Sequence, residues 1–147
     1  MKGNILNIFK SSGNSLTRID NFPVIVKSNK KIEKQRVVVN SEEEFNNLMN
    51  KILDDSTKVK APNVDYSKNR LLVVSTATNE TTGFGIKIKS ILKTGQVGKL
   101  DAIIEFQKPG DNCQLTNEPN VAIDVVQLTK DSGEITFDKE EKTVACK

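Results

Sequence analysis

The chain has 147 residues, enough for one domain with a real core, and its 36% hydrophobic and 28% charged residues are typical of a folded protein. The formal net charge of +3 comes from scattered lysines. Histidine is absent, which excludes Ser-His and Cys-His nucleophile pairs and imidazole metal ligands. No apolar run exceeds about six residues, which excludes a membrane-spanning helix of about 20 residues.

The first part of the chain predicts short strands separated by polar turns. We interpret residues 1–35 as an N-terminal β extension or as extra strands, followed by a β domain over residues 36–147. Pro23 lies in the apolar run Phe22–Val26 and indicates an edge strand or the start of a strand, because proline has no N–H to donate. The β-branched residues within Gln35–Asn40 predict a stronger strand.

The densest basic group of the sequence is Lys27–Lys34. It is interrupted by Glu33 and contains no aromatic residue, whereas nucleic-acid sites combine a basic stripe with stacking side chains. We therefore expect a solvated turn here and no nucleic-acid partner.

One helix is predicted over Ser41–Asp54. Ser41 is a suitable N-cap and Glu44, three residues later, completes a capping box. Apolar residues recur at helical spacing, which predicts a buried stripe. The stripe consists of Phe45, Leu48, Met49, Ile52 and Leu53. We expect it to pack on a sheet face formed partly by Leu72, Val74, Ile86 and Ile88.

The stretch 64–91 predicts a β-hairpin with a long tip. The apolar run Leu71–Val74 leads into the hydroxyl-rich loop Thr76–Thr82, and a strand with alternating apolar residues follows from Phe84. Loops of this length between adjacent strands are often functional. The side-chain oxygens of Thr76–Thr82 could accept hydrogen bonds from a partner, and a solvated hairpin tip is the equally weighted alternative.

The rest of the chain continues the pattern of strands and turns. Further strands are predicted at Leu100–Gln107, Val121–Leu128 and Glu134–Phe137, with a long polar loop at Lys108–Asn120. About seven strands and one helix favour a mainly β fold: a single antiparallel β-sandwich or curled sheet covered by the helix.

The two cysteines, Cys113 and Cys146, predict a disulfide. The chain lacks the partners of a two-cysteine zinc site and shows no base beside either thiol, although two unpaired thiols remain an alternative. The bond would close a loop of about 34 residues and would imply an oxidising, extracytoplasmic compartment: periplasmic, secreted or lipid-anchored. Met1 is not followed by a signal peptide, so if the disulfide forms, we expect that a natural leader is missing from this sequence.

No catalytic residue, cofactor site or metal site is predicted. The candidate acids are dispersed along the sequence, and paired acid-base chemistry requires two of them to meet. They are Asp65, Asp101, Glu105, Asp111, Glu118 and Asp124. We therefore expect a non-enzymatic protein.

The order of motifs over residues 36–130 resembles the C-terminal domain of the PrcB family, accessory subunits of secreted bacterial protease complexes. The matching residues are Asp65, Tyr66, Ser67, Thr82, Gly83, Phe84 and Pro119, the last of these preceding the strand Val121–Val125. The second glycine of the family's Thr-Gly-Gly-Tyr step is absent. The resemblance implies an exported binding module that associates with, or stabilises, a protease or another envelope protein.

A second resemblance concerns one loop. Asn79, Glu80, Thr81, Thr82, Gly83 and Phe84 are similar to the Asn-Pro-Thr-Thr-Gly-aromatic loop of chagasin-like cysteine-protease inhibitors, with Glu80 in place of proline. These inhibitors are immunoglobulin-like sandwiches that insert such loops into a protease cleft. The resemblance implies partner binding through residues 79–84. A structural β domain of the cell surface is the third alternative.

Overall fold

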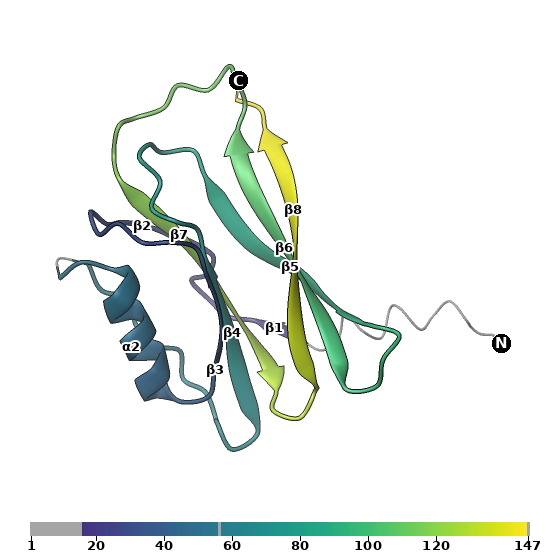
Figure 1. Ribbon diagram of the computed structural model, residues 1–147. Coiled ribbons are helices and arrows are strands. Elements are labelled where there is room, and N and C mark those ends of the chain that lie inside the picture. The colour runs from purple at the N-terminus through teal and green to yellow at the C-terminus, as the bar shows by residue number, and fades with distance from the viewer. Residues whose placement is uncertain (1–15, 56, 147) are drawn as a thin grey trace.

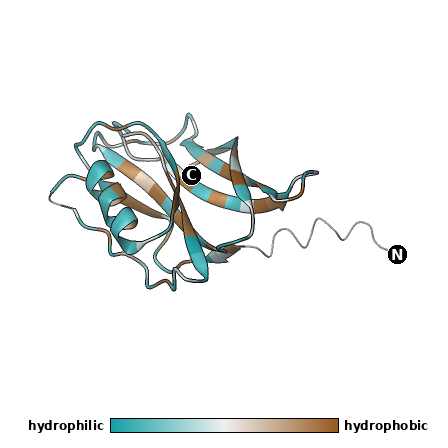
Figure 2. Cartoon of the chain, turned by 60° about the horizontal axis from the view of Figure 1, so that its bottom comes forward, coloured by the Kyte–Doolittle hydropathy of each residue, from teal (hydrophilic) through white to brown (hydrophobic). Residues whose placement is uncertain are grey.

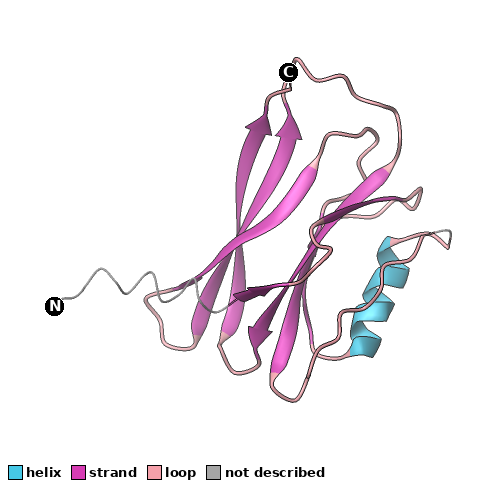
Figure 3. Ribbon diagram, turned by 180° about the vertical axis from the view of Figure 1, so that it is seen from behind, coloured by secondary structure: helices cyan, strands magenta, loops and turns pink. Residues whose placement is uncertain are grey.

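The protein is described by a computed structural model, which covers residues 16–55 and 57–146. The described part forms two unclosed β-sheets that face each other, with one helix on the outer side of the larger sheet (Figures 1 and 3). The elements are β1 (Leu16–Arg18), β2 (Val24–Lys27), β3 (Gln35–Val39), α2 (Glu42–Ile52), β4 (Asn69–Ser75), β5 (Gly85–Lys93), β6 (Lys99–Pro109), β7 (Asn120–Thr129) and β8 (Glu134–Val144). The predicted class, mainly β with one helix, is confirmed.

The larger sheet is built around β7 and β4. Strand β4 pairs antiparallel with β3 on one edge and with β7 on the other. The opposite edge of β7 is occupied by two short strands in succession, with β1 beside residues 126–128 and β2 beside residues 120–123. The described part of the predicted N-terminal extension thus belongs to this sheet, and residues 1–15 lie outside the described residues.

The smaller sheet has the order β5-β6-β8. Strands β5 and β6 form an antiparallel hairpin, whereas β6 and β8 run parallel. The parallel pair arises because a short turn after β7 carries the chain from the larger sheet to the smaller one, where β8 begins at Glu134.

The predicted hairpin over residues 64–91 is wrong. Strand β4 already has a partner on each edge, and β5 lies in the opposite sheet, so residues 76–84 cross from one sheet to the other. Both strands send apolar side chains into the same space between the sheets, among them Leu72 and Ile88. Two strands with alternating apolar residues can be hydrogen-bonded neighbours in one sheet or can lie in two sheets that pack face to face. The sequence pattern is the same in both cases, so it could not distinguish them.

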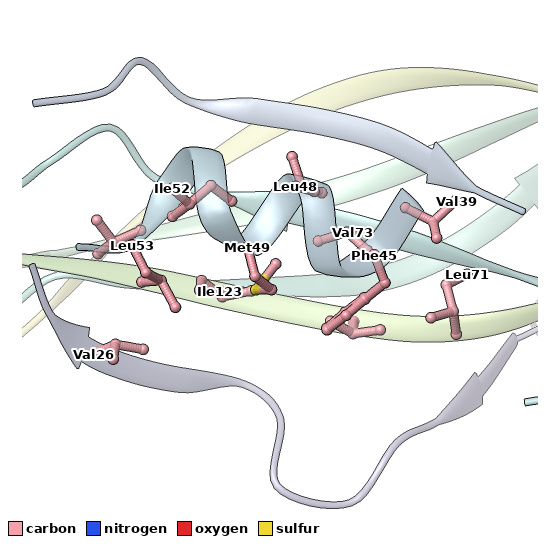
Figure 4. Packing of buried hydrophobic residues seen from close by; sticks show 12 residues of the cluster. Val26, Val39, Phe45, Leu48, Met49, Ile52, Leu53, Leu71, Val73 and Ile123 are labelled. Carbon is pink, nitrogen blue, oxygen red and sulfur yellow. The ribbon is translucent and has the colours of Figure 1, made fainter. Parts of the chain in front are cut away.

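The helix begins and ends as its sequence predicts. Ser41 Oγ accepts a hydrogen bond from the Glu44 N–H at 3.1 Å, and Glu44 Oε1 accepts one from the Asn40 N–H at 2.9 Å. The predicted stripe is buried (Figure 4). Its members are Phe45, Leu48, Met49, Ile52 and Leu53. Burying one such side chain stabilises the fold by roughly 1.5–3 kcal/mol.

The stripe packs on a different sheet face from the one predicted. It contacts the face that carries Leu71, Val73 and Ile123, whereas the four residues expected there line the space between the sheets. The run Leu71–Val74 is apolar at every position because both faces of β4 are buried, so the sequence does not say which alternate residues face the helix. Figure 2 shows apolar and polar bands alternating along other strands, where one face is solvated.

The described helix has 11 residues and lacks the length and apolar character needed to cross a membrane.

Candidate functional site

The predicted disulfide between Cys113 and Cys146 is present, with Cα atoms 5.0 Å apart. It ties the loop between β6 and β7 to the end of β8, beside which Figure 1 places the C-terminus. Hydrogen bonds reinforce the tie. The Gly110 N–H donates to Val144 O at 2.9 Å, and Asn112 bonds both backbone polar groups of Cys146 through its side-chain amide. Intramolecular disulfides are typical of proteins in oxidising compartments.

The crossing segment 76–84 is joined to the same loop through Asn120. The Asn79 N–H donates to Asn120 O at 2.8 Å and the Asn120 N–H donates back to Asn79 O at 3.0 Å. The buried Asn120 amide also donates to Thr81 O and to Glu118 O, each at 2.8 Å. Asn120 is therefore the residue through which the crossing segment and the loop before β7 are hydrogen-bonded to each other, and we call it the hub. It is the first residue of an apolar strand, and the sequence does not single it out.

Further contacts fix the second half of the crossing segment. The Thr82 N–H donates to Thr116 O at 2.9 Å, and Thr82 Oγ1 accepts from the Thr116 N–H at 3.0 Å. Gly83 has a φ of +111°, and a Cβ there would lie 3.0 Å from Leu115 Cδ2. Phe84 stacks on Phe106 with ring centroids 5.8 Å apart. A glycine is needed at position 83 for its backbone conformation and for close packing.

The first half of the segment is held by the chain that precedes β3. Thr78 Oγ1 accepts from the Ile32 N–H at 2.9 Å and donates to Lys30 O at 2.6 Å. Glu80 forms an exposed ion pair with Lys31 at 3.1 Å. The hydroxyls of Thr78 and Thr82, which the sequence left as candidates for a partner or for solvent, are thus engaged within the protein.

These segments are joined by the disulfide and by hydrogen bonds at one end of the sandwich, which we call the stapled end and define as residues 76–84, 109–120 and 144–146. Two large apolar side chains of the stapled end remain open to solvent: Leu115 with 44% and Val144 with 43% of its surface exposed. The predicted partner-binding residues Asn79–Phe84 all belong to it. The exposed surface is nevertheless supplied largely by the loop 110–119, which the sequence marks only as long and polar.

One candidate acid, Asp124, pairs with a basic side chain. Asp124 is fully buried and meets Arg18, whose Nη2 lies 2.7 Å from Asp124 Oδ1. Asp124 Oδ2 accepts from the Ile88 N–H at 2.7 Å, and Arg18 Nη1 donates to Ile88 O at 3.0 Å. Burial raises the pKa of the Asp124 carboxyl, and the bonds from Ile88 and Arg18 oppose that shift. Arg18 and Asp124 together bind the backbone N–H and C=O of Ile88 and so attach the edge strand β5 to the larger sheet, which is a structural role.

Asp101 lies beside Asp138 on the outer side of the smaller sheet. Burial, together with the hydrogen bond and charge of Asp138, raises the pKa of Asp101. Among residues 16–55 and 57–146, no group of three or more acidic, cysteine or histidine side chains is arranged to hold a metal ion.

Comparison with protein-family models, with curated proteins and with solved structures finds no match. The resemblances to the PrcB family and to chagasin-like inhibitors therefore stay predictions.

Proposed function

We propose that this domain is a non-enzymatic, extracytoplasmic binding module that contacts a partner protein through its stapled end. The observation that carries the proposal is the combination of rigidity and exposed apolar surface there. A disulfide and the Asn120 hydrogen bonds fix three chain segments, while Leu115 and Val144 remain exposed. Surfaces that are ordered before binding lose less conformational entropy when a partner docks.

The compartment and the partner class rest on separate arguments. The disulfide supports a periplasmic, secreted or lipid-anchored location, because cytosolic thiols are kept reduced. The PrcB-like order of motifs supports a protease, or another envelope protein associated with one, as the partner.

Protease inhibition through Asn79–Phe84 is the second candidate function. The segment is held by bonds to Asn120 and Thr116, and protease inhibitors change their backbone little on binding. A panel of papain-like and subtilisin-like proteases tests this alternative. Sub-micromolar inhibition that is lost in Thr82→Ala would favour the inhibitor over the accessory module.

The binding proposal is tested by affinity capture from the extracytoplasmic fraction of the source organism. The bait is the wild-type chain, the variant Leu115→Glu, or the control Val97→Glu. Val97 is fully exposed at the tip of the β5–β6 hairpin, at the opposite end of the smaller sheet. We expect one protein to be retained by the wild type and the control and lost with Leu115→Glu. Equal recovery with all three baits would contradict binding through the stapled end.

A further inference from the structure

A small cavity of about 190 Å³ opens between the two sheets, beside the stapled end. It is lined by residues of β3, an edge strand of the larger sheet, and of β8, an edge strand of the smaller sheet. Its apolar part is formed by Ala77, Ile86 and Phe106, and Asn79 of the crossing segment also lines it. The cavity therefore adjoins the proposed binding surface without being part of its exposed apolar area.

The charged residues that line this cavity are all basic: Lys34, Arg36 and Lys139. Two of them point inward by the alternation of their strands. Val38 of β3 and Phe137 of β8 pack against the core between the sheets, and Arg36 and Lys139 lie two residues from them on the same strand faces. Positive charge thus converges on a partly apolar space.

This positive charge is poorly compensated within the described residues. Arg36 is half-buried, and within the described part of the chain its Nη1 donates to two neutral carbonyl oxygens, Gln35 O at 2.8 Å and Ser75 O at 3.0 Å. Burial lowers the pKa of the Arg36 guanidinium. Lys34 forms no ion pair with a described residue, and Lys139 has an exposed pair with Glu141 at 3.1 Å. Exposed pairs of this kind hold their partners weakly, so Lys139 remains available to another anion.

We propose that this cavity binds a glutamate side chain of the partner protein, an inference that rests on the proposed binding function. A carboxylate would supply an anionic partner, which Arg36 does not find among the described residues, in the planar geometry that guanidinium groups bind best. The two methylene groups of glutamate suit the apolar part formed by Ile86 and Phe106. At about 190 Å³ the cavity fits one side chain and is smaller than the roughly 300–1,000 Å³ of pockets that enclose whole small molecules.

The test is a titration of the isotope-labelled chain, followed by amide NMR shifts, with three blocked tripeptides. They are acetyl-Ala-Glu-Ala-amide and its counterparts with Gln or Asp in the centre. We expect saturable shifts at Arg36, Ala77 and Phe106 with the Glu peptide. The Gln peptide should bind about tenfold more weakly, since it loses the charge-assisted bonds, and the Asp peptide should fall between them.

Variants assign the binding to the cavity. Lys34→Gln and Arg36→Gln should each weaken binding of the Glu peptide several-fold. Lys34 makes no bond to a described residue, so its variant stays informative if the loss of Arg36 disturbs folding. Lys93→Gln, an exposed charge near the β5–β6 hairpin tip, is the matched control and should bind as the wild type does.

Three results would overturn the inference. They are equal binding of the Glu and Gln peptides, shifts spread over lysines across the surface, and displacement of the Glu peptide by an equal concentration of inorganic phosphate. The peptide titration does not depend on the capture experiment. If the Glu peptide binds but no partner is captured, the carboxylate site is supported and binding through the stapled end is contradicted. If a partner is captured but the Glu peptide does not bind, only the carboxylate site is contradicted.

Discussion

The two ends of the smaller sheet are closed in different ways. At the hairpin end, short turns suffice: Gly98 and Gly133 take φ values of +78° and +133°, and the Glu134 N–H donates to Gly98 O at 2.8 Å. At the stapled end the chain leaves β6 at Pro109 and returns only at Asn120, and it is ordered by a disulfide and side-chain amides. A loop too long to close as a tight turn needs such contacts, which also make it a candidate binding surface.

The largest effect on stability is expected from removal of the Cys113–Cys146 disulfide. The double variant Cys113→Ser, Cys146→Ser should lower the free energy of unfolding by about 3–4 kcal/mol, because the unfolded chain regains the entropy of a 33-residue separation. Amide hydrogen exchange should quicken in the loop 110–119 and stay unchanged at residues 94–98. Denaturant unfolding measures the change in the free energy of unfolding. A similar rise in exchange at both ends would show that the bond stabilises the whole domain and does not order one end.

A smaller effect is expected at the hub. Asn120→Ala removes three side-chain hydrogen bonds: the two that its amide donates to Thr81 O and Glu118 O, and the one that its Oδ1 accepts from Asn79 Nδ2. Leaving those carbonyls without that donor should cost about 1–3 kcal/mol. Thermal or denaturant unfolding measures it. The variant Gln114→Ala in the same loop is the control, since Gln114 is exposed, and its stability should stay within about 0.5 kcal/mol of the wild type. Equal stabilities of the two variants would remove Asn120 as the hub.

Glycine substitutions compare the ends directly. Gly83→Ala at the stapled end and Gly133→Ala at the hairpin end should each cost about 1–3 kcal/mol, since both glycines have positive φ and a Cβ would crowd a neighbour at 3.0 or 2.8 Å. A Cβ at position 95 would have no described residue within 4 Å apart from its chain neighbours, so Gly95→Ala should be nearly neutral. The denaturant midpoints of unfolding of the three variants measure these differences. A tolerated Gly83→Ala would mean that the crossing segment adjusts easily and is not rigid.

The smallest effect concerns pH at the hairpin-side half of the smaller sheet. The pKa of Asp101 is raised in the folded state, so protonation favours folding, and this contribution is lost as pH rises through the folded value. Asp138→Asn removes the neighbouring charge and should make the domain slightly more stable at neutral pH, with the gain fading below about pH 4. Unfolding curves at several pH values check this. A gain that persists at pH 3 would contradict the electrostatic origin.

The sequence predicted local features well and the arrangement of sheets poorly. Helix α2 follows from its cap and its spacing, and the disulfide follows from the lack of zinc-site partners or of a base beside either cysteine. The pairing of β4 could not be predicted, because its apolar run is buried on both faces. Strand β8 extends beyond the predicted Glu134–Phe137 and continues to Val144 through the charged run Asp138–Lys142, because charged side chains suit an exposed edge strand.

The stapled end was only partly visible in the sequence. Its loops stood out by length and composition, and residues 79–84 by their resemblance to an inhibitor loop. What orders them depends on contacts between distant segments, such as Asn120 with Thr81 and Leu115 with Gly83. No local pattern encodes such contacts. Asp124 was noticed as a dispersed acid, but its pairing with Arg18 depends on how β1 lies against β7.

Site-specific photo-crosslinking in the source organism tests the central claim most directly. A photoreactive residue is placed at Leu115 of the stapled end or at Val97 of the hairpin end, both exposed in the free domain. We predict a discrete crosslinked species of one partner protein from position 115, absent from position 97 and lost when the Cys113–Cys146 bond is removed. Crosslinks from position 97 alone, or equal crosslinks from both positions, would contradict binding through the stapled end.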